Sequence, residues 1–328
     1  MKLCLVGPGI MSIPPVGWGA VEILIWDYYN ELKKQGYDIT IINKIRVSPR
    51  DQMNPTTYYC QELIKEINNG NYDFVHLHYD CLFHIVPFLI CKKVGLTSHY
   101  PYIDQPAKHI SDGYSNIFNF MCNTNKYINF VLADKDLQFM IEKGVSPTLA
   151  FKLDNGISVE QFKFTPNPLY FNKTIYLGQV NDRKGQHKYC HLKNIDIIGP
   201  ISGNNNSSLQ NYKGTWTRSD VHSQLTNYGN LLLLSKGEAD PLVVKEAIVA
   251  GLGVVINETS AKNLKENEFI TIIKDTDMDN FELIQQKLDE NRERSLKMRE
   301  EIRNYGKNNF GWGKLLEQYI KHINSIQN

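Results

Sequence analysis

Hydrophobic residues along the chain follow two alternating patterns, short continuous runs and longer stretches with helical spacing. After Ala20 the apolar positions recur every three or four residues, which predicts one face of a helix, and Gly36 stands where its C-terminal cap is expected. Helices are also predicted over 57–68 and 136–143, and residues 87–93 are expected to end another. Continuous apolar runs predict strands at 2–6, 38–42, 74–78, 96–99, 130–133 and 149–153.

The alternation stops at residues 163–173 and then starts again. This segment is rich in Pro, Asn and Phe and has little periodicity, so it predicts a linker. Beyond it we expect a polar Asn-rich loop at 203–211, a helix over 242–250, and a charged helical tail from Phe281 that ends in an apolar set beginning at Trp312. Further apolar runs predict strands at 174–177, 195–198, 231–234 and 253–256.

Strands that alternate with helices imply parallel sheets built from right-handed βαβ units. We therefore predict an α/β protein with two consecutive Rossmann-like domains, each a doubly wound parallel sheet. The first domain is expected over residues 1–165 and the second over 170–309, with a C-terminal helix at about 310–328 that packs back on the first.

The composition excludes several classes of protein. The 328 residues are 42% hydrophobic and 22% charged, which is typical of a soluble globular protein, and the net charge of +1 provides no bulk attraction to nucleic acid. The six cysteines are scattered without a C-x-x-C pair, so neither a zinc site nor a disulfide framework is expected. The N-terminal apolar run is too short for a signal peptide, and no run approaches the roughly 18 apolar residues of a membrane span. We expect a soluble protein of the reducing cytoplasm without a transmembrane segment.

The most informative segment is LLLLSKGEADPLVVKEAIVAGLGVVI, residues 231–256. A buried strand ends in a Gly-Glu-Ala-Asp loop, Pro241 takes the first helical position, and Gly251 follows the helix end. The positive N-terminus of such a helix faces the carboxyl ends of the strands, where open parallel sheets bind ligands. The pattern predicts an anion site for phosphate, with Glu238 before the helix and Glu246 within it.

The spacing of Glu238 and Glu246 resembles the E-x7-E motif of retaining glycosyltransferases of family 4, which have the GT-B fold. The resemblance implies a nucleotide-sugar donor that binds in a cleft between the two domains. The positions that match the pattern of that family are Glu238, Pro241, Leu242, Val243, Glu246, Ala247, Ala250, Gly251 and Val255.

The resemblance also assigns roles within this segment. Glu238 would be catalytic, lying against the transferred sugar, and Glu246 would accept hydrogen bonds from the ribose. The backbone amides around Asp240, Pro241, Leu242 and Val243 would meet the sugar or phosphates of the donor, although Asp240 replaces an aromatic residue that is common in the family. A helix-capping Glu238 with a solvated Glu246 is the structural alternative.

The segment YLGQVNDRKG, residues 176–185, resembles the G-R-x-x-x-x-K-G loop of the same family. Lys184 would neutralise the diphosphate leaving group. Gln179 stands in place of the usual arginine of the phosphate site, and Arg183 is a candidate substitute. A surface position without function is the alternative for Arg183 and Lys184.

In the first domain, PPVGWGAVE resembles the G-G-x-x-E loop of the family. Gly17 and Gly19 would let the backbone approach the donor phosphates, and Trp18 would shape the acceptor side. His99 ends a strand and fits a catalytic histidine beside the transferred sugar, and His78 ends another strand and is a possible acceptor-side residue. Packing without function is the alternative for Trp18 and for both histidines.

We therefore expect a hexosyltransferase that uses a UDP-sugar, or a GDP-sugar, and an acceptor hydroxyl of unknown glycan, lipid-linked or protein origin. A GT-B sugar-nucleotide epimerase and a catalytically weak nucleotide-sugar-binding partner protein are the alternatives. A dehydrogenase is disfavoured because the Gly7-Pro8-Gly9 run lacks the third glycine and is followed by Pro14 and Pro15. No cofactor and no metal are expected, since the D-x-D spacing at residues 275–277 is better explained as a solvated charge run.

Overall fold

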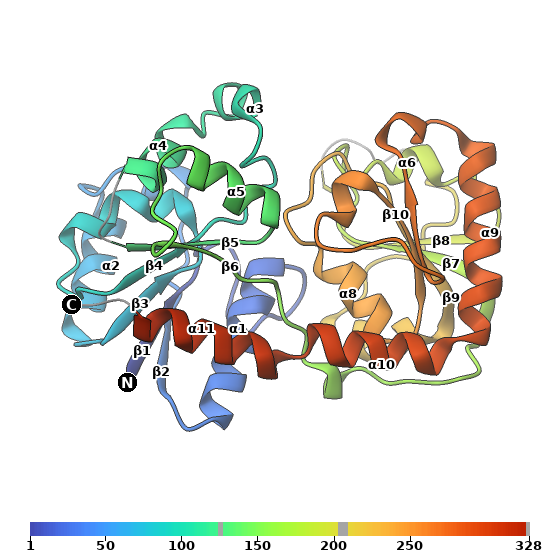
Figure 1. The fold of residues 1–328 in the computed structure, drawn as a ribbon, viewed down its shortest axis with the longest axis horizontal. Coiled ribbons are helices and arrows are strands. Elements are labelled where there is room, and N and C mark those ends of the chain that lie inside the picture. Colours follow the sequence, from blue (N-terminus) through green and yellow to red (C-terminus); the bar gives the residue numbers. More distant parts are fainter. Residues whose placement is uncertain (124–126, 203–208, 326–328) are drawn as a thin grey trace. The chain divides into compact units, whose positions relative to one another are not determined.

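The computed structural model describes residues 1–123, 127–202 and 209–325 (Figure 1). The chain divides into two compact units. Unit 1 contains Met1–Asn155 together with the chain from Trp312 onward, and unit 2 contains Gly156–Gly311.

Unit 1 is built on a six-stranded parallel sheet with the order β2-β1-β3-β4-β5-β6 (Figure 1). Its longer helices are α1 (Ala20–Lys34), α2 (Tyr58–Asn69), α4 (Ser115–Asn123), α5 (Asp134–Glu142) and α11 (Trp312–Ser325), with the short α3 (Pro106–Ser111) and a 3-10 segment η2 (Asp80–Phe88). Its strands are β1 (Lys2–Val6), β2 (Asp38–Ile42), β3 (Phe74–Leu77), β4 (Val94–Thr97), β5 (Tyr127–Val131) and β6 (Ala150–Lys152).

Alternate side chains of these strands serve two cores, because successive residues of a strand point to opposite faces. Cys4 and Val75 point into the core beneath α2 and η2, whereas Leu3 and Phe74 point into the core beneath α1 and α11. The C-terminal helix α11 thus contributes its apolar face to unit 1, beside α1 (Figure 1).

Unit 2 is built on a five-stranded parallel sheet with the order β11-β10-β9-β7-β8. Its strands are β7 (Tyr170–Leu177), β8 (Ile195–Ile198), β9 (Tyr228–Leu233), β10 (Gly253–Asn257) and β11 (Ile270–Ile273). Its helices are α6 (Gln186–Tyr189), α7 (Arg218–Gln224), α8 (Leu242–Val249), α9 (Phe281–Lys297) and α10 (Arg299–Phe310).

Three local predictions are wrong or incomplete. Residues 87–93 do not end an α-helix: a 3-10 segment stops at Phe88, just after Pro87, and β4 then begins at Val94. The second half of the expected linker is the start of β7, whose first residues are exposed and therefore lack a hydrophobic pattern. The sequence pattern also missed β11 (Ile270–Ile273), and most of the polar loop predicted at 203–211 lies outside the described residues.

Candidate functional site

The sheet of unit 2 reverses its winding direction between β7 and β9. From β7 the chain runs to β8 on one side, and it returns to β9 on the other side of β7. In open parallel sheets, ligands bind outside the carboxyl ends of the strands at such a point. The loops that leave this point, 178–185 after β7 and 234–241 after β9, carry most of the donor-binding residues predicted for this unit.

Lys184, Arg183 and Glu238 form one ion-pair cluster across these two loops. The ammonium Nζ of Lys184 donates to Glu238 Oε1 at 2.9 Å, and Arg183 Nη1 lies 3.1 Å from the same oxygen. Arg183 Nη1 also donates to the carbonyl of Gly237. The side chains of Lys184 and Glu238 are 11% and 10% exposed, whereas that of Arg183 is 40% exposed. Two cations and one carboxylate therefore meet at the carboxyl ends of β7 and β9.

The carboxylate of Glu238 is held in its ionised form. Burial by itself would raise its pKa, but the charges of Lys184 and Arg183, with hydrogen bonds from Lys184 and Ser235, hold the pKa below its usual value. A carboxylate in this state can accept hydrogen bonds from hydroxyl groups or balance a nearby positive charge. Its two cations can also exchange it for another anion.

Tyr176, the next-to-last residue of β7, links the two loops. This buried side chain donates to the carbonyl of Lys184 and lies 3.1 Å from the carbonyl of Leu234. The amide of Lys184 in turn donates to Asn181 Oδ1 at 3.0 Å. Nothing in the sequence singles out Tyr176, because an aromatic residue in an apolar strand gives no sign that its hydroxyl bridges two loops.

Glu246 lies on α8 and is paired with Arg218, the first residue of α7. Arg218 Nη1 lies 2.5 Å from Glu246 Oε1, and the side chains are 16% and 6% exposed. The Arg218 guanidinium also lies over the ring of Phe162, 5.5 Å from its centroid. Arg218 was not among the predicted site residues, although the capping box formed by Thr217 and Asp220 could have placed it in the first turn of a helix.

Asp240 turns its carboxylate toward α8. Its Oδ2 accepts a hydrogen bond from Lys245 Nζ at 2.6 Å, and both side chains are almost fully buried. Pro241 occupies the N-cap position and not the first helical position that was predicted, because α8 begins at Leu242; no side chain makes a capping hydrogen bond there. Leu242 is buried and Val243 is half-buried. An ion pair therefore fixes the loop that contains Glu238 to the helix that contains Glu246.

Gln179, which the sequence resemblance aligned with an arginine, lies apart from the ion-pair cluster. It is exposed, and its Oε1 accepts a hydrogen bond from Asn181 Nδ2 at 3.4 Å. Arg183, which follows four positions later, is the residue of this loop that joins Lys184 beside Glu238.

The sheet of unit 1 has its own reversal, between β1 and β3. The amide of His78 donates to the carbonyl of Val6 at 2.9 Å and so marks the carboxyl ends of both strands. The glycine-rich loop after β1 leads from there into α1, as the sequence predicted. The carboxyl ends in unit 1 thus carry the loop of Gly17, Trp18 and Gly19.

The glycine-rich loop is pinned to α1 by Glu22. This buried carboxylate accepts a hydrogen bond from the amide of Met11 at 3.2 Å, and burial raises its pKa. Gly19 has φ +159°, and a Cβ there would lie 2.6 Å from Glu22 Oε2, so glycine is required for the close approach. Gly17 has open space around it, and Trp18 is half-buried.

His78 and His99 lie near each other at the carboxyl ends of β3 and β4. Their rings are 6.3 Å apart and nearly parallel, and the ring of His76 lies 3.9 Å from that of His78. Neither ring nitrogen of the buried His78 has a hydrogen-bond partner among the described residues. Burial, followed by the influence of His76 and His99, places the pKa of His78 well below its usual value, so its ring is neutral. His99 is half-buried.

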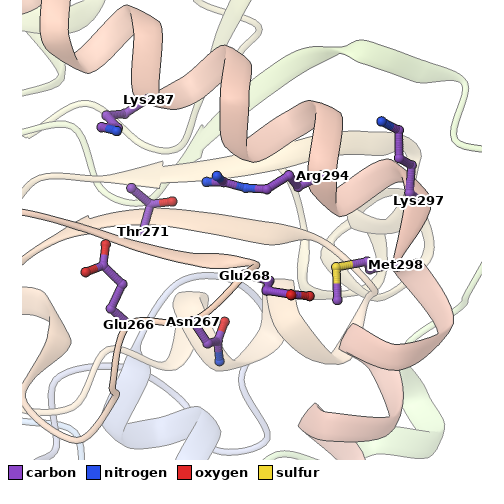
Figure 2. Close-up of a pocket in the computed structure, with 8 residues that line it drawn as sticks. All are labelled: Glu266, Asn267, Glu268, Thr271, Lys287, Arg294, Lys297 and Met298. Carbon is purple, nitrogen blue, oxygen red and sulfur yellow. The ribbon is translucent and has the colours of Figure 1, made fainter.

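A separate hollow of about 750 Å³ lies between α9 and the segment that enters β11 (Figure 2). Its described lining residues belong to neither of the loops that follow β7 and β9. Figure 2 shows Lys287, Arg294 and Lys297 on α9, and Glu266 and Glu268 on the segment before β11. Basic and acidic side chains are thus mixed around this hollow.

Among the residues described, no group of His, Cys, Asp and Glu has the arrangement of a metal site. The D-x-D residues illustrate this, because Asp275 is bonded to Asn257 and Thr259 instead. Within the same described residues, no helix is long and apolar enough to cross a membrane.

Solved structures resemble this chain over nearly its whole length. HepE of Anabaena, solved in complex with UDP-glucose, has a TM-score of 0.74 at 13% identity and covers 99% of this chain and 100% of its own. WaaG, a glycosyltransferase of lipopolysaccharide biosynthesis, has a TM-score of 0.74 at 15% identity with coverage of 99% and 100%. Sucrose-phosphate synthase of Thermosynechococcus elongatus has a TM-score of 0.70 at 14% identity, with 98% of each chain covered.

This chain has the GT-B fold. Its two Rossmann-like parallel sheets and the full coverage of these structures confirm the fold class predicted from the sequence. At identities of 13–15% the likeness establishes the fold alone. No family model matches the sequence, and a comparison with curated proteins found no match.

Proposed function

We propose that this protein is a retaining glycosyltransferase that moves a hexose from a nucleotide-diphosphate sugar to an acceptor hydroxyl. The observation that carries this proposal is the cluster of Lys184, Arg183 and Glu238 at the strand reversal of unit 2. The helix α8, which contains Glu246, begins at Leu242, shortly after Glu238 in the sequence. It combines cations for a diphosphate with carboxylates for hydroxyl groups, which are the two chemical parts of a sugar nucleotide.

In this proposal Lys184 and Arg183 hold the donor diphosphate. As the bond between the anomeric carbon and the phosphate oxygen breaks, negative charge accumulates on that phosphate, and the two cations stabilise it. Arg183 takes the place of the family arginine that is missing at Gln179, because its guanidinium already lies 3.1 Å from the carboxylate shared with Lys184.

Glu238 exchanges partners when the donor binds. The diphosphate takes over Lys184 and Arg183, and the carboxylate then accepts hydrogen bonds from hydroxyl groups of the transferred sugar. The acceptor oxygen forms the new bond to the anomeric carbon on the face that the phosphate leaves, and the acceptor proton passes to the departing phosphate oxygen. One glycosidic bond forms as the sugar–phosphate bond breaks, and no further reactant is needed.

Glu246 binds the ribose hydroxyls, and the nucleotide is proposed to be UDP, with GDP as the other possibility. The structure of HepE with UDP-glucose supports UDP, because the folds agree over 99% of this chain. In unit 1, His99 is proposed to contact the sugar, and the loop of Gly17, Trp18 and Gly19 to approach the donor through its backbone.

The first test is a thermal-shift screen of the purified protein against UDP-, GDP-, ADP- and dTDP-glucose. A melting temperature that rises with one of these sugars, followed by release of the free nucleoside diphosphate in the presence of an acceptor glycan, would support the proposal. The anomeric configuration of the product, read by NMR, tests retention, and a free epimerised sugar nucleotide would indicate an epimerase. Absence of any shift with all four sugars would refute the proposal.

A further inference from the structure

Arg218 occupies a position in unit 2 that the E-x7-E resemblance does not explain. It is the first residue of α7, on the connection between β8 and β9, whereas Glu246 lies in α8 after β9. The two residues are 28 positions apart in sequence, yet their Nη1 and Oε1 atoms lie 2.5 Å apart. Only the fold brings them together.

The contact is directed by more than charge. The side chain of Glu246 is 6% exposed and that of Arg218 is 16% exposed, so both groups are largely removed from water. The ring of Phe162 covers the guanidinium at 5.5 Å, and the ring of His222 packs against Phe162 at 4.8 Å. A planar guanidinium held over an aromatic ring loses little further freedom when it donates a hydrogen bond, and lysine has no planar group to take its place.

The contact also leaves part of the carboxylate for a ligand. Arg218 engages Oε1, and among the described residues no hydrogen bond is recorded to Oε2 of Glu246. A carboxylate whose one oxygen is fixed by arginine presents the other oxygen in a constant direction. Such an oxygen can accept hydrogen bonds from vicinal hydroxyl groups without first losing side-chain freedom.

We propose that Arg218 is a positioning residue that fixes Glu246 for recognition of the ribose 2′- and 3′-hydroxyls of the donor nucleotide. This inference rests on the proposed function, because it assigns the ribose to Glu246. It adds a determinant from a different helix, and it makes recognition of the sugar nucleotide depend on the packing of α7 against α8.

The test compares UDP with 2′,3′-dideoxy-UDP by titration calorimetry. The wild-type protein should bind UDP more tightly than the dideoxy analogue. Arg218→Gln removes the charge and should weaken UDP binding about tenfold, the size of one charge-assisted hydrogen bond, while binding of the dideoxy analogue changes less than about twofold. Glu246→Gln should show the same selectivity, and the double variant should lose no more than either single variant.

Two further variants serve as controls. Arg294→Gln removes an arginine that lines the hollow of Figure 2, and it should leave both affinities unchanged. Arg218→Lys keeps the charge without the planar fork and should weaken UDP binding only partly. If Arg218→Gln fails to fold, the pair Arg218→Gln/Glu246→Gln leaves no buried unpaired charge and allows the same comparison of the two ligands.

The outcomes separate the two proposals. Equal losses for UDP and the dideoxy analogue in Arg218→Gln would mean a purely structural role, and no loss for either would mean no role, so both overturn the inference. Equal affinity of the wild-type protein for UDP and the dideoxy analogue would overturn the inference as well, because it would show that the ribose hydroxyls are not recognised. Failure of the wild-type protein to bind any nucleoside diphosphate would instead overturn the proposed function, and the inference with it.

Discussion

The carboxylate of Glu238 is paired with Lys184 and Arg183, the two cations that we propose for the donor diphosphate. This arrangement leads to a counterintuitive prediction. Replacing Glu238 by glutamine removes the negative charge but keeps the size of the side chain. Lys184 and Arg183 are then available to the diphosphate without first giving up an ion pair. We expect Glu238→Gln to bind UDP more tightly than the wild-type protein, although it loses transfer.

The size of the gain follows from the burial of the contacts. Lys184 and Glu238 are 11% and 10% exposed at the side chain and lie 2.9 Å apart, so their contact has the strength of a hydrogen bond between charged groups, about 1.5–3 kcal/mol. The contact of Arg183, which is 40% exposed, adds only about 0–1 kcal/mol because water screens it. Glutamine retains part of these contacts, so a tightening of roughly 10- to 100-fold is expected.

Titration calorimetry with UDP and with uridine measures this effect. Uridine lacks the diphosphate, so its affinity should be the same in both proteins. Transfer from the donor sugar should fall by about two orders of magnitude or more, as for the loss of one electrostatic group in an active site. An unchanged or weaker affinity of Glu238→Gln for UDP, with uridine unaffected, would refute the idea that Glu238 and the diphosphate compete for the same cations.

Three other predictions follow from the structure. In titration calorimetry, Arg183→Ala should weaken UDP binding about tenfold, whereas Gln179→Ala should change it less than about twofold. The reason is that Arg183 belongs to the ion-pair cluster and Gln179 is exposed. A larger loss for Gln179→Ala than for Arg183→Ala would contradict our assignment. Lys245→Met removes the cation that is paired with the buried Asp240 carboxylate and should destabilise the protein by about 3–5 kcal/mol in denaturant titrations, whereas the double replacement with Asp240→Asn should recover much of this loss. The free energy of unfolding should also fall on acidification below pH ~6.5, by about 1.4 kcal/mol per pH unit for His78. The reason is that the imidazole is protonated in the unfolded chain but stays neutral in the folded protein, where its pKa is lowered. His78→Phe should reduce this slope but not abolish it, because burial also lowers the pKa of His76 to about 3 and that of His222 to about 4. An unchanged slope would show that other groups cause the acid lability.

The architecture was accessible from the sequence because local patterns encode it. Continuous apolar runs and helical spacing located β1, β2 and α8 within a residue or so, and their alternation implied parallel sheets. The pattern failed where a strand is exposed, as in the first half of β7, and where a short strand such as β11 carries little signal. Near Pro87 the pattern instead predicted an α-helix where there is none, because the apolar residues there form a 3-10 segment.

The candidate site was only partly accessible. The resemblance predicted roles for Glu238, Glu246 and Lys184 one segment at a time, since each sits in a recognisable local context. It did not show that Lys184 and Glu238, which are 54 positions apart, share an ion pair, or that Arg183 joins them while Gln179 does not. These facts depend on the reversal of strand order between β7 and β9, which no local pattern records.

The sequence by itself determined the class of fold and the short segments that carry charged groups, because propensity, periodicity and the E-x7-E spacing act over a few residues. The tertiary structure alone decided which of those groups meet. It paired Glu238 with Lys184 and Arg183, and it brought Arg218 to Glu246 across 28 residues. The physical reason is that an ion pair acts over a few ångströms in space whatever the separation along the chain, and only the packed sheet sets those distances.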